Sequence, residues 1–373
     1  MSAGLPRYIK TLDGGRALAC LMVLVSHNVF ALKLGEFEWL LSAFAMDFFF
    51  VLSGFLIARI LLGYIRENKS LKVFMLNRAM RLFPVYYLTI MVLVLFWDGT
   101  QAGWWLSYTT NFEILTAIAT ENWSLLPGAP IGHSWSLAIE EQFYLTSTLL
   151  FALLTPQRVR ATIFVGILLG LGTALVLAIL EVDLLGPLLY FGTPFRFGIF
   201  GAGMLLAFYE SNIANSMRRF QWIGCAAMVA GIALHLVSSA LDTFYEDILA
   251  NALGLPLIAW GLLLVLLCQS GRDTIVEACM SNTVLRGIGK ISYGLYVFHL
   301  PVYLAFDVAT PVGVSGIAQG SPTALKASLA LVSVFILASI SYFFLEQPIH
   351  RRRGAVAQKL FPGSVTKTQE KMS

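Results

Sequence analysis

Long apolar stretches, separated by short polar segments, follow one another along the 373-residue chain. A helix needs roughly 20 predominantly apolar residues to cross the hydrocarbon core of a bilayer, which is about 30 Å thick. Ten stretches approach or reach that length, at about 13–32, 41–63, 83–97, 134–155, 161–180, 188–209, 220–240, 248–269, 291–306 and 327–345. The pattern predicts an all-α, polytopic membrane bundle of about ten transmembrane helices.

Lysine and arginine gather on alternate connecting segments, and cytoplasmic loops are the ones that collect basic residues. One side carries nearly all of them: Arg7, Lys10, Arg66, Lys69, Lys72, Arg78, Arg81, Arg158, Arg160, Arg218, Arg219, Arg272, Arg286, Lys290, Arg351, Arg352 and Arg353. The other side holds Lys33, Lys326 and most of the acidic residues. Both termini are therefore predicted to be cytoplasmic. We expect a transmembrane domain over 1–350 and a polar cytoplasmic tail over 351–373.

Composition agrees with a membrane protein, because 58% hydrophobic and 12% charged residues lie outside the range of soluble domains. The net charge of +4 resides in the predicted cytoplasmic loops, which favours membrane lipids as partners and argues against nucleic acid. The four cysteines, Cys20, Cys225, Cys268 and Cys279, show no CxxC spacing. Neither a disulfide framework nor a metal site is predicted.

Two ionisable residues, Arg16 and His27, lie inside the first apolar stretch with ten residues between them. Eleven steps of about 100° return to nearly the same helix face, about 16 Å further along the axis. Ionisable side chains in membrane segments are costly and indicate a functional site by default. The predicted orientation places Arg16 near the cytosol and His27 in the outer half of the membrane.

Arginines mark the cytosolic ends of several predicted spans. Arg59 lies near the cytosolic end of the second span. Arg78 and Arg81, just before the third, share a helix face at i and i+3. A guanidinium group makes charge-assisted, bidentate contacts with phosphates. Together with Arg16, these residues are predicted to bind the phosphates of an acyl-CoA donor; the alternative is that they only enforce topology.

The outer half is predicted to hold the catalytic groups. Histidine has an unperturbed pKa near 6.5, so His27 can act as general base toward an acceptor hydroxyl. A carboxylate, Asp47 or Glu140, is expected to orient the imidazole. The alternatives are that His27 only forms hydrogen bonds between helices and that Asp47 pairs with a membrane-embedded arginine.

Further residues are predicted to contact the substrate. Ser136, Glu140 and Tyr144 share a helix face at i, i+4 and i+8. The full substrate set comprises Trp135, Ser136, Glu141, Tyr144 and His299. Alternatively, Trp135 belongs to an aromatic belt at the membrane interface, and His299 only packs against neighbouring helices. His133 is interpreted as a residue of the helix start.

Six motifs carry a resemblance to a known family. They are LDGGRALACLMVLVSH, DFFFVLSGFLIARIL, NRAMRLFPVYYL, HSWSLAIEEQFYL, ISYGLYVFHLPV and SYFFLEQPIHRR, in this order along nearly the whole chain. The chain resembles the acyltransferase 3 family of integral membrane acyltransferases, whose members O-acylate carbohydrates and other hydroxyl-bearing acceptors. Gly15 departs from the family pattern, where a bulky apolar residue is usual.

The resemblance implies a multi-pass enzyme of the bacterial cytoplasmic (inner) membrane. Its donor would be cytosolic acyl-CoA, by default acetyl-CoA. The acceptor would be an extracytoplasmic glycan, a glycolipid or a small hydroxylated molecule, consistent with O-acetylation and polysaccharide modification. The competing hypothesis is a transporter or flippase whose buried His, Asp and Arg form a proton or substrate path. Paired broken helices, which many transporters contain, are not evident in the sequence.

Overall fold

The chain folds as an all-helical bundle in a computed structural model, which describes residues 8–28, 36–96, 99–122, 130–238, 246–308 and 323–361. No strand occurs within these ranges, so the predicted all-α class is confirmed. The helices are α1 (Lys10–Ser26), α2 (Glu36–Arg66), α3 (Leu71–Phe96), α4 (Ala102–Leu106), α5 (Thr110–Ala119), η2 (Gly132–Ser134), α6 (Trp135–Leu153), α7 (Pro156–Ile179), α8 (Leu185–Phe191), α9 (Thr193–Phe208), α10 (Glu210–Asn215), α11 (Met217–Ser238), η3 (Asp247–Gly254), α13 (Leu255–Gln269), α14 (Ile275–Met280), α15 (Thr283–Ala305), α16 (Ala324–Ser341), η4 (Tyr342–Glu346) and α17 (Gln347–Leu360).

Six helical segments of the described residues are long and apolar enough to cross a membrane: Trp39–Arg66, Leu71–Phe96, Pro156–Ile179, Met217–Ser238, Asp247–Gln269 and Ala324–Leu360. The pair α8 and α9, bent by 48°, raises the number to seven. Three other predicted spans correspond to α1, α6 and α15, which do not meet this standard. These three helices carry polar residues of the site described below, and α1 has only 17 residues. The count of ten spans stays a prediction.

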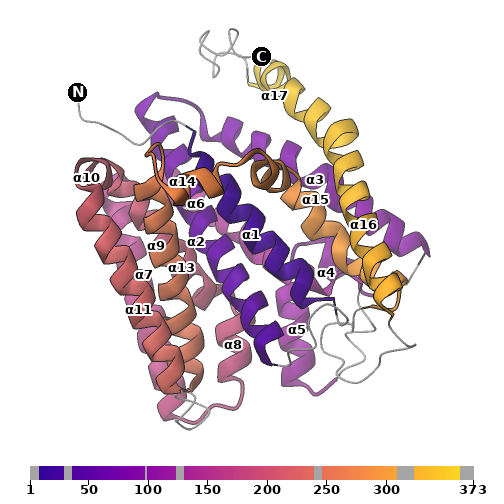
Figure 1. The fold of residues 1–373 in the computed structure, drawn as a ribbon, viewed down its shortest axis with the longest axis horizontal. Helices are drawn as coiled ribbons and strands as arrows, with labels where there is room; N and C mark the ends of the chain where they lie inside the picture. The colour runs from indigo at the N-terminus through magenta and orange to yellow at the C-terminus, as the bar shows by residue number, and fades with distance from the viewer. Residues whose placement is uncertain are drawn as a thin grey trace.

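Helix α2 lies at the centre of the bundle and packs against α1, α6, α9 and α13 (Figure 1). Stacked aromatic rings fill the core beside it, with centroids 4.5 Å apart for Phe50 and Phe200 and 4.2 Å apart for Phe143 and Phe200. A Cβ atom on Gly54 of α2 would lie 2.0 Å from the carbonyl oxygen of Phe200 on α9. Glycine thus permits the backbones of α2 and α9 to approach closely, as small residues do at membrane helix contacts.

Helices α1 and α15 lie side by side and bring residues far apart in the chain into contact. A Cβ on Gly289 of α15 would lie 2.3 Å from the carbonyl oxygen of Asp13 on α1. Next to them, α16 continues through the short π-helical segment η4 into α17, which contains residues 351–360 of the predicted tail. The start of α1 and the end of α17 lie at the same end of the bundle, and α5 and α8 lie at the other (Figure 1).

Candidate active site

A cavity of about 300 Å³ lies between α1, α2, α3, α6 and α15. It extends from Tyr8 and Ile9, just before α1, to Ser136 on α6 and Tyr296 on α15. Seven of the predicted site residues line it, and they come from four helices: Arg16, Arg59, Arg78, Arg81, Ser136, Glu140 and Tyr144. The fold therefore gathers all four predicted donor-binding residues around one space.

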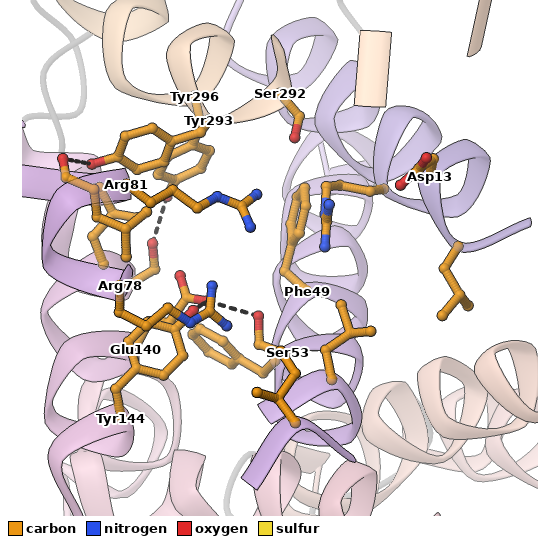
Figure 2. Close-up of a pocket in the computed structure, with 18 of the residues that line it drawn as sticks. Asp13, Phe49, Ser53, Arg78, Arg81, Glu140, Tyr144, Ser292, Tyr293 and Tyr296 are labelled. Carbon is orange, nitrogen blue, oxygen red and sulfur yellow. Dashed lines mark hydrogen bonds between the residues drawn. The ribbon is translucent and has the colours of Figure 1, made fainter. Parts of the chain in front are cut away.

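Three arginines of the cavity, Arg16, Arg78 and Arg81, form what we call the arginine cluster. Arg81 lies within electrostatic range of both Arg16 and Arg78. Figure 2 shows the side chains of Arg78 and Arg81 reaching from α3 across the cavity toward Phe49 and Ser53 on α2. Within the part of the chain that the structure describes, no ion pair joins this cluster to a carboxylate. Like charges brought together in this way favour the binding of a multiply charged anion.

Arg59 lines the same cavity but has a carboxylate partner. Its Nε and Nη2 atoms each lie 2.9 Å from an oxygen of Glu210 on α10, which is a bidentate pair. The pair neutralises the charge of Arg59 and fixes its orientation. Arg59 thus differs electrostatically from the arginine cluster.

Glu140 on α6 provides a carboxylate in the same cavity, within electrostatic range of Arg81. Its Oε1 atom accepts hydrogen bonds from Ser53 Oγ at 2.7 Å and from the hydroxyl of Tyr144. The guanidinium carbon of Arg78 lies 4.4 Å from the centroid of the Tyr144 ring, in cation–π contact. These contacts connect α2, α3 and α6 around the cavity (Figure 2).

Glu141 does not line the cavity, although it is adjacent to Glu140 in the chain. It lies within electrostatic range of the hydroxyls of Tyr86, Tyr87 and Tyr108. One of its carboxylate oxygens is buried and forms no hydrogen bond within the described residues. Of the two glutamates, Glu140 is the one in the cavity.

Three histidines, His27, His133 and His299, pack against one another beyond the cavity, and we call them the histidine cluster. The ring centroids of His27 and His299 are 5.1 Å apart, and those of His133 and His299 are 4.6 Å apart. His133 and His299 are fully buried. The rings come from the end of α1, from η2 and from α15, so three distant segments meet here.

Backbone carbonyls orient two of these rings. The Nδ1 atom of His27 lies 2.9 Å from the carbonyl oxygen of Val23, and that of His299 lies 2.6 Å from the carbonyl oxygen of Tyr296. A carbonyl oxygen only accepts, so each Nδ1 carries the hydrogen and each neutral ring keeps its lone pair at Nε2. The sequence predicts a carboxylate that orients His27; in the structure the backbone carbonyl of Val23 holds that position.

Asp47 forms a buried ion pair with Arg196 on α9. Arg196 also donates through Nε to the carbonyl oxygen of Tyr190 at 2.7 Å, and its guanidinium group lies 4.6 Å from the centroid of the Tyr190 ring. Trp135 packs against the same Tyr190 ring, with centroids 5.0 Å apart. Asp47 and Trp135 thus belong to a layer between α2, α6, α8 and α9 that does not line the cavity.

Three residues of this arrangement were not predicted as site residues: Arg196, His133 and Tyr296. Arg196 is a charge inside the predicted span 188–209, the signal that singled out Arg16 and His27. His133 and Tyr296 lie inside two of the quoted motifs. Tyr296 shares a helix face with His299 at i and i+3, which the helical period could have indicated. The contact of His133 with His299 joins segments far apart in the chain, and nothing in the sequence indicates it.

Comparison with known proteins assigns the chain to a family. Residues 9–343 match a family model described as an acyltransferase domain, and this segment contains every predicted site residue. The chain belongs to the acyltransferase 3 family. The predicted resemblance is therefore confirmed. No solved structure matches the chain.

Relatives of this acyltransferase 3 chain come from bacteria. It is 30% identical to the peptidoglycan O-acetyltransferase OatA of Listeria monocytogenes, over 92% of this chain and 56% of the relative. It is 29% identical to the O-acetyltransferase OatA of Staphylococcus aureus, over 96% of this chain and 59% of the relative. It is 28% identical to the putative peptidoglycan O-acetyltransferase YrhL of Bacillus subtilis, over 92% of this chain and 55% of the relative. The chain thus spans less than two thirds of the length of these relatives.

The acyltransferase 3 site divides into two chemically different parts. The arginine cluster lies in the cavity, and the histidine cluster lies beyond Ser136 and Tyr296. Among the described residues, no group of three or more His, Cys, Asp or Glu side chains is arranged to hold a metal ion. The arrangement offers positive charge at one end and a basic nitrogen at the other.

Proposed function

We propose that the chain is a membrane-embedded O-acetyltransferase. It takes the acyl group from cytosolic acetyl-CoA and delivers it to a hydroxyl of an extracytoplasmic glycan. The observation that carries the proposal is the convergence of Arg16, Arg78 and Arg81 in a cavity whose far end adjoins the histidine cluster. Membership of the acyltransferase 3 family supports acyl transfer as the reaction class.

The residues of the cavity suit a CoA thioester. Its phosphates require several positive charges, which the arginine cluster offers without a competing carboxylate ion pair among the described residues. The Nε atom of Arg78 is buried and lacks a hydrogen-bond acceptor there, so it can donate to a phosphate oxygen. Arg59, already paired with Glu210, contributes at the wall of the cavity. The thioester end would point toward Ser136 and Tyr296.

His27 is proposed as the general base. With its Nδ1 hydrogen directed at Val23, the ring presents Nε2 to an acceptor hydroxyl. Removing the hydroxyl proton makes the oxygen a nucleophile toward the thioester carbonyl. His299 packs on the same ring and limits the orientations that His27 can adopt. In this proposal Asp47 supports the surrounding helices through Arg196 and does not orient the base.

The acceptor class follows from the relatives. Two of them are named for peptidoglycan, so a glycan hydroxyl of the peptidoglycan type is the acceptor that we propose. The membrane is proposed to be the bacterial cytoplasmic membrane, with the arginine cluster toward the cytosol, as the distribution of basic residues predicts. A transporter reading has no comparable support, since the family model is that of an acyltransferase.

The test is turnover by the purified protein with radiolabelled acetyl-CoA and soluble peptidoglycan glycan fragments. We expect label to enter the glycan and free CoA to appear in equal amounts. His27→Ala should lower kcat at least 100-fold while CoA binding persists, because the base is distant from the arginine cluster. Arg78→Ala and Arg81→Ala should weaken CoA binding about tenfold or more, because each removes a charge-assisted contact.

Arg158→Ala is the matched control for the arginines. Arg158 lies at the start of α7, is exposed and belongs to the same predicted cytoplasmic set. Its replacement should leave CoA affinity unchanged. If Arg78→Ala and Arg158→Ala bind CoA as the unmodified chain does, the arginines serve topology alone. If the unmodified chain neither binds nor consumes acetyl-CoA, the proposed function is wrong.

A further inference from the structure

Tyr296 on α15 lies where the cavity meets the histidine cluster. Ser292, Tyr296 and His299 lie on one face of α15 at i, i+4 and i+7. Ser292 and Tyr296 line the cavity, and His299 does not. The Tyr296 ring also contacts His133 and His299, with centroids 5.2 Å and 5.4 Å away. Tyr296 thus touches both parts of the site.

The hydroxyl of Tyr296 is held against that of Ser136 at this junction. The two oxygens are 2.6 Å apart, and both residues are buried (Figure 2). Tyr296 also donates to the carbonyl oxygen of His133 at 2.9 Å, and Ser136 Oγ lies 3.3 Å from the same carbonyl. Both hydroxyls lie within hydrogen-bond distance of the same backbone carbonyl, that of His133. One hydroxyl can therefore donate to this carbonyl, and the hydrogen of the other can turn toward a new acceptor oxygen.

We propose that Tyr296 donates a hydrogen bond to the carbonyl oxygen of the thioester during acyl transfer, while Ser136 takes its place as donor to the carbonyl oxygen of His133. The inference rests on the proposed function and assigns Tyr296 a catalytic role. A donor anchored by its phosphates in the arginine cluster extends along the cavity toward Ser136 and Tyr296. These are the cavity hydroxyls that adjoin the histidine cluster, so the reacting carbonyl reaches them as it meets the acceptor.

The reaction balances with these groups. The acceptor oxygen bonds to the carbonyl carbon as its proton moves to Nε2 of His27. The electron pair of the C=O bond moves to the oxygen, whose negative charge receives the hydrogen bond of Tyr296. The pair then returns, the C–S bond breaks, and the CoA thiolate leaves with the proton from His27. The products are the acetyl ester and free CoA. Fixed hydrogen-bond donors in a water-poor site stabilise such a charge strongly. Removing one donor of this kind lowers kcat by a factor of about 10²–10³.

A purely structural role for the hydroxyl makes different predictions. If it only joins α15 to the carbonyl of His133, its removal lowers stability and leaves kcat of the folded protein unchanged. If it stabilises charge in the transition state, its removal lowers kcat and leaves CoA affinity unchanged. Tyr296→Phe separates the two cases, because phenylalanine keeps the ring that packs on His133 and His299.

Tyr303→Phe is the control, because Tyr303 belongs to the same helix, is fully buried and donates to the carbonyl oxygen of Leu24 at 3.1 Å. It does not line the cavity. Using acetyl-CoA and soluble glycan fragments, we expect Tyr296→Phe to lower kcat roughly 100-fold and Ser136→Ala roughly tenfold, with CoA affinity within twofold of that of the unmodified chain. Tyr303→Phe should keep kcat within threefold.

A spectroscopic measurement tests the contact directly. In the His27→Ala background, which prevents turnover, the infrared C=O band of bound acetyl-CoA labelled with ¹³C at the carbonyl should lie lower than in water. Adding Tyr296→Phe should move the band back up. Unchanged kcat, an unmoved band or lost CoA binding in Tyr296→Phe would overturn the assignment. If the unmodified chain transfers acetyl groups and this activity depends on His27, such a result overturns only the role of Tyr296 and leaves the proposed function in place. If the unmodified chain transfers no acetyl group, both the proposed function and the role of Tyr296 are wrong.

Discussion

Individual arginines of this protein differ in whether they have a carboxylate partner. Arg59 pairs with Glu210 and Arg196 pairs with Asp47. The arginine cluster has no such pair among the described residues. A buried charge is costly unless it is paired, so the pairing of Arg59 and Arg196 indicates a structural role. Several guanidinium groups in one cavity without a carboxylate ion pair indicate that a ligand supplies the negative charge.

The first prediction concerns Asp47 and Arg196. Replacing either residue by alanine leaves the other charge buried and alone, which costs about 3–5 kcal/mol of stability. The double variant Asp47→Ala with Arg196→Met removes both charges and should cost less than the sum of the single changes. Thermal unfolding in detergent measures this. Single variants that keep their stability but lose kcat would instead favour Asp47 as a catalytic residue.

The second prediction concerns Glu113 on α5, outside the membrane-spanning segments. Burial raises the pKa of Glu113 to about 7, and the nearby Trp105 side chain acts in the opposite direction. Because the folded chain favours the protonated acid, its contribution to stability is complete below the ordinary pKa of about 4.5 and is lost as the pH rises through about 7.

The unmodified chain should therefore lose on the order of 1–3 kcal/mol of stability as the pH rises from 5 to 8. Glu113→Gln should not show this loss, because glutamine does not ionise. The melting temperature of the variant should exceed that of the unmodified chain at pH 8 and match it at pH 5. Parallel pH profiles for the two proteins would show that Glu113 titrates normally. Glu121→Gln, at an exposed position after α5, is the control.

At the scale of helices, the packing of α1 against α15 aligns the arginine cluster with the histidine cluster. Gly289 allows α15 to approach the backbone of α1 at Asp13. This contact sets the height of Tyr296 and His299 relative to Arg16 and His27. A shift of one helix against the other by about 1 Å is enough to misplace reacting groups.

The third prediction tests that alignment. Gly289→Ala places a Cβ 2.3 Å from the carbonyl oxygen of Asp13, so α15 must move. We expect a loss of about 1–3 kcal/mol in stability and at least a tenfold loss in kcat. Gly287→Ala on the same helix meets no atom within 4 Å and should change neither by much. Equal turnover of the two variants would mean that this contact does not control the site.

Helix-level features were partly predictable from sequence. Periodicity placed Ser136, Glu140 and Tyr144 on one face, and all three line the cavity. The partners of Asp47 and His27 were not predictable, because they depend on which helices become neighbours. Three of the helices around the cavity, α1, α6 and α15, also fall short of the combined length and hydropathy standard for spans. Their polar residues weaken the signal by which a membrane helix is recognised.

At the scale of the whole molecule, the arginine and histidine clusters lie at successive depths along α1 and α15. Arg16 is near the start of α1 and His27 directly follows its end. A helix of this length separates them by about 16 Å. Basic loops predict that the arginine end faces the cytosol. Donor and acceptor are therefore expected to enter from opposite sides of the membrane.

Transfer in sealed proteoliposomes tests this claim most directly. Radiolabelled acetyl-CoA is trapped inside vesicles that contain the purified protein, and soluble glycan fragments are added outside. We predict labelled glycan outside and free CoA inside, with transfer abolished by His27→Ala and reduced by Arg78→Ala at limiting donor. Vesicles that remain sealed yet transfer only when donor and acceptor share one compartment would contradict the account.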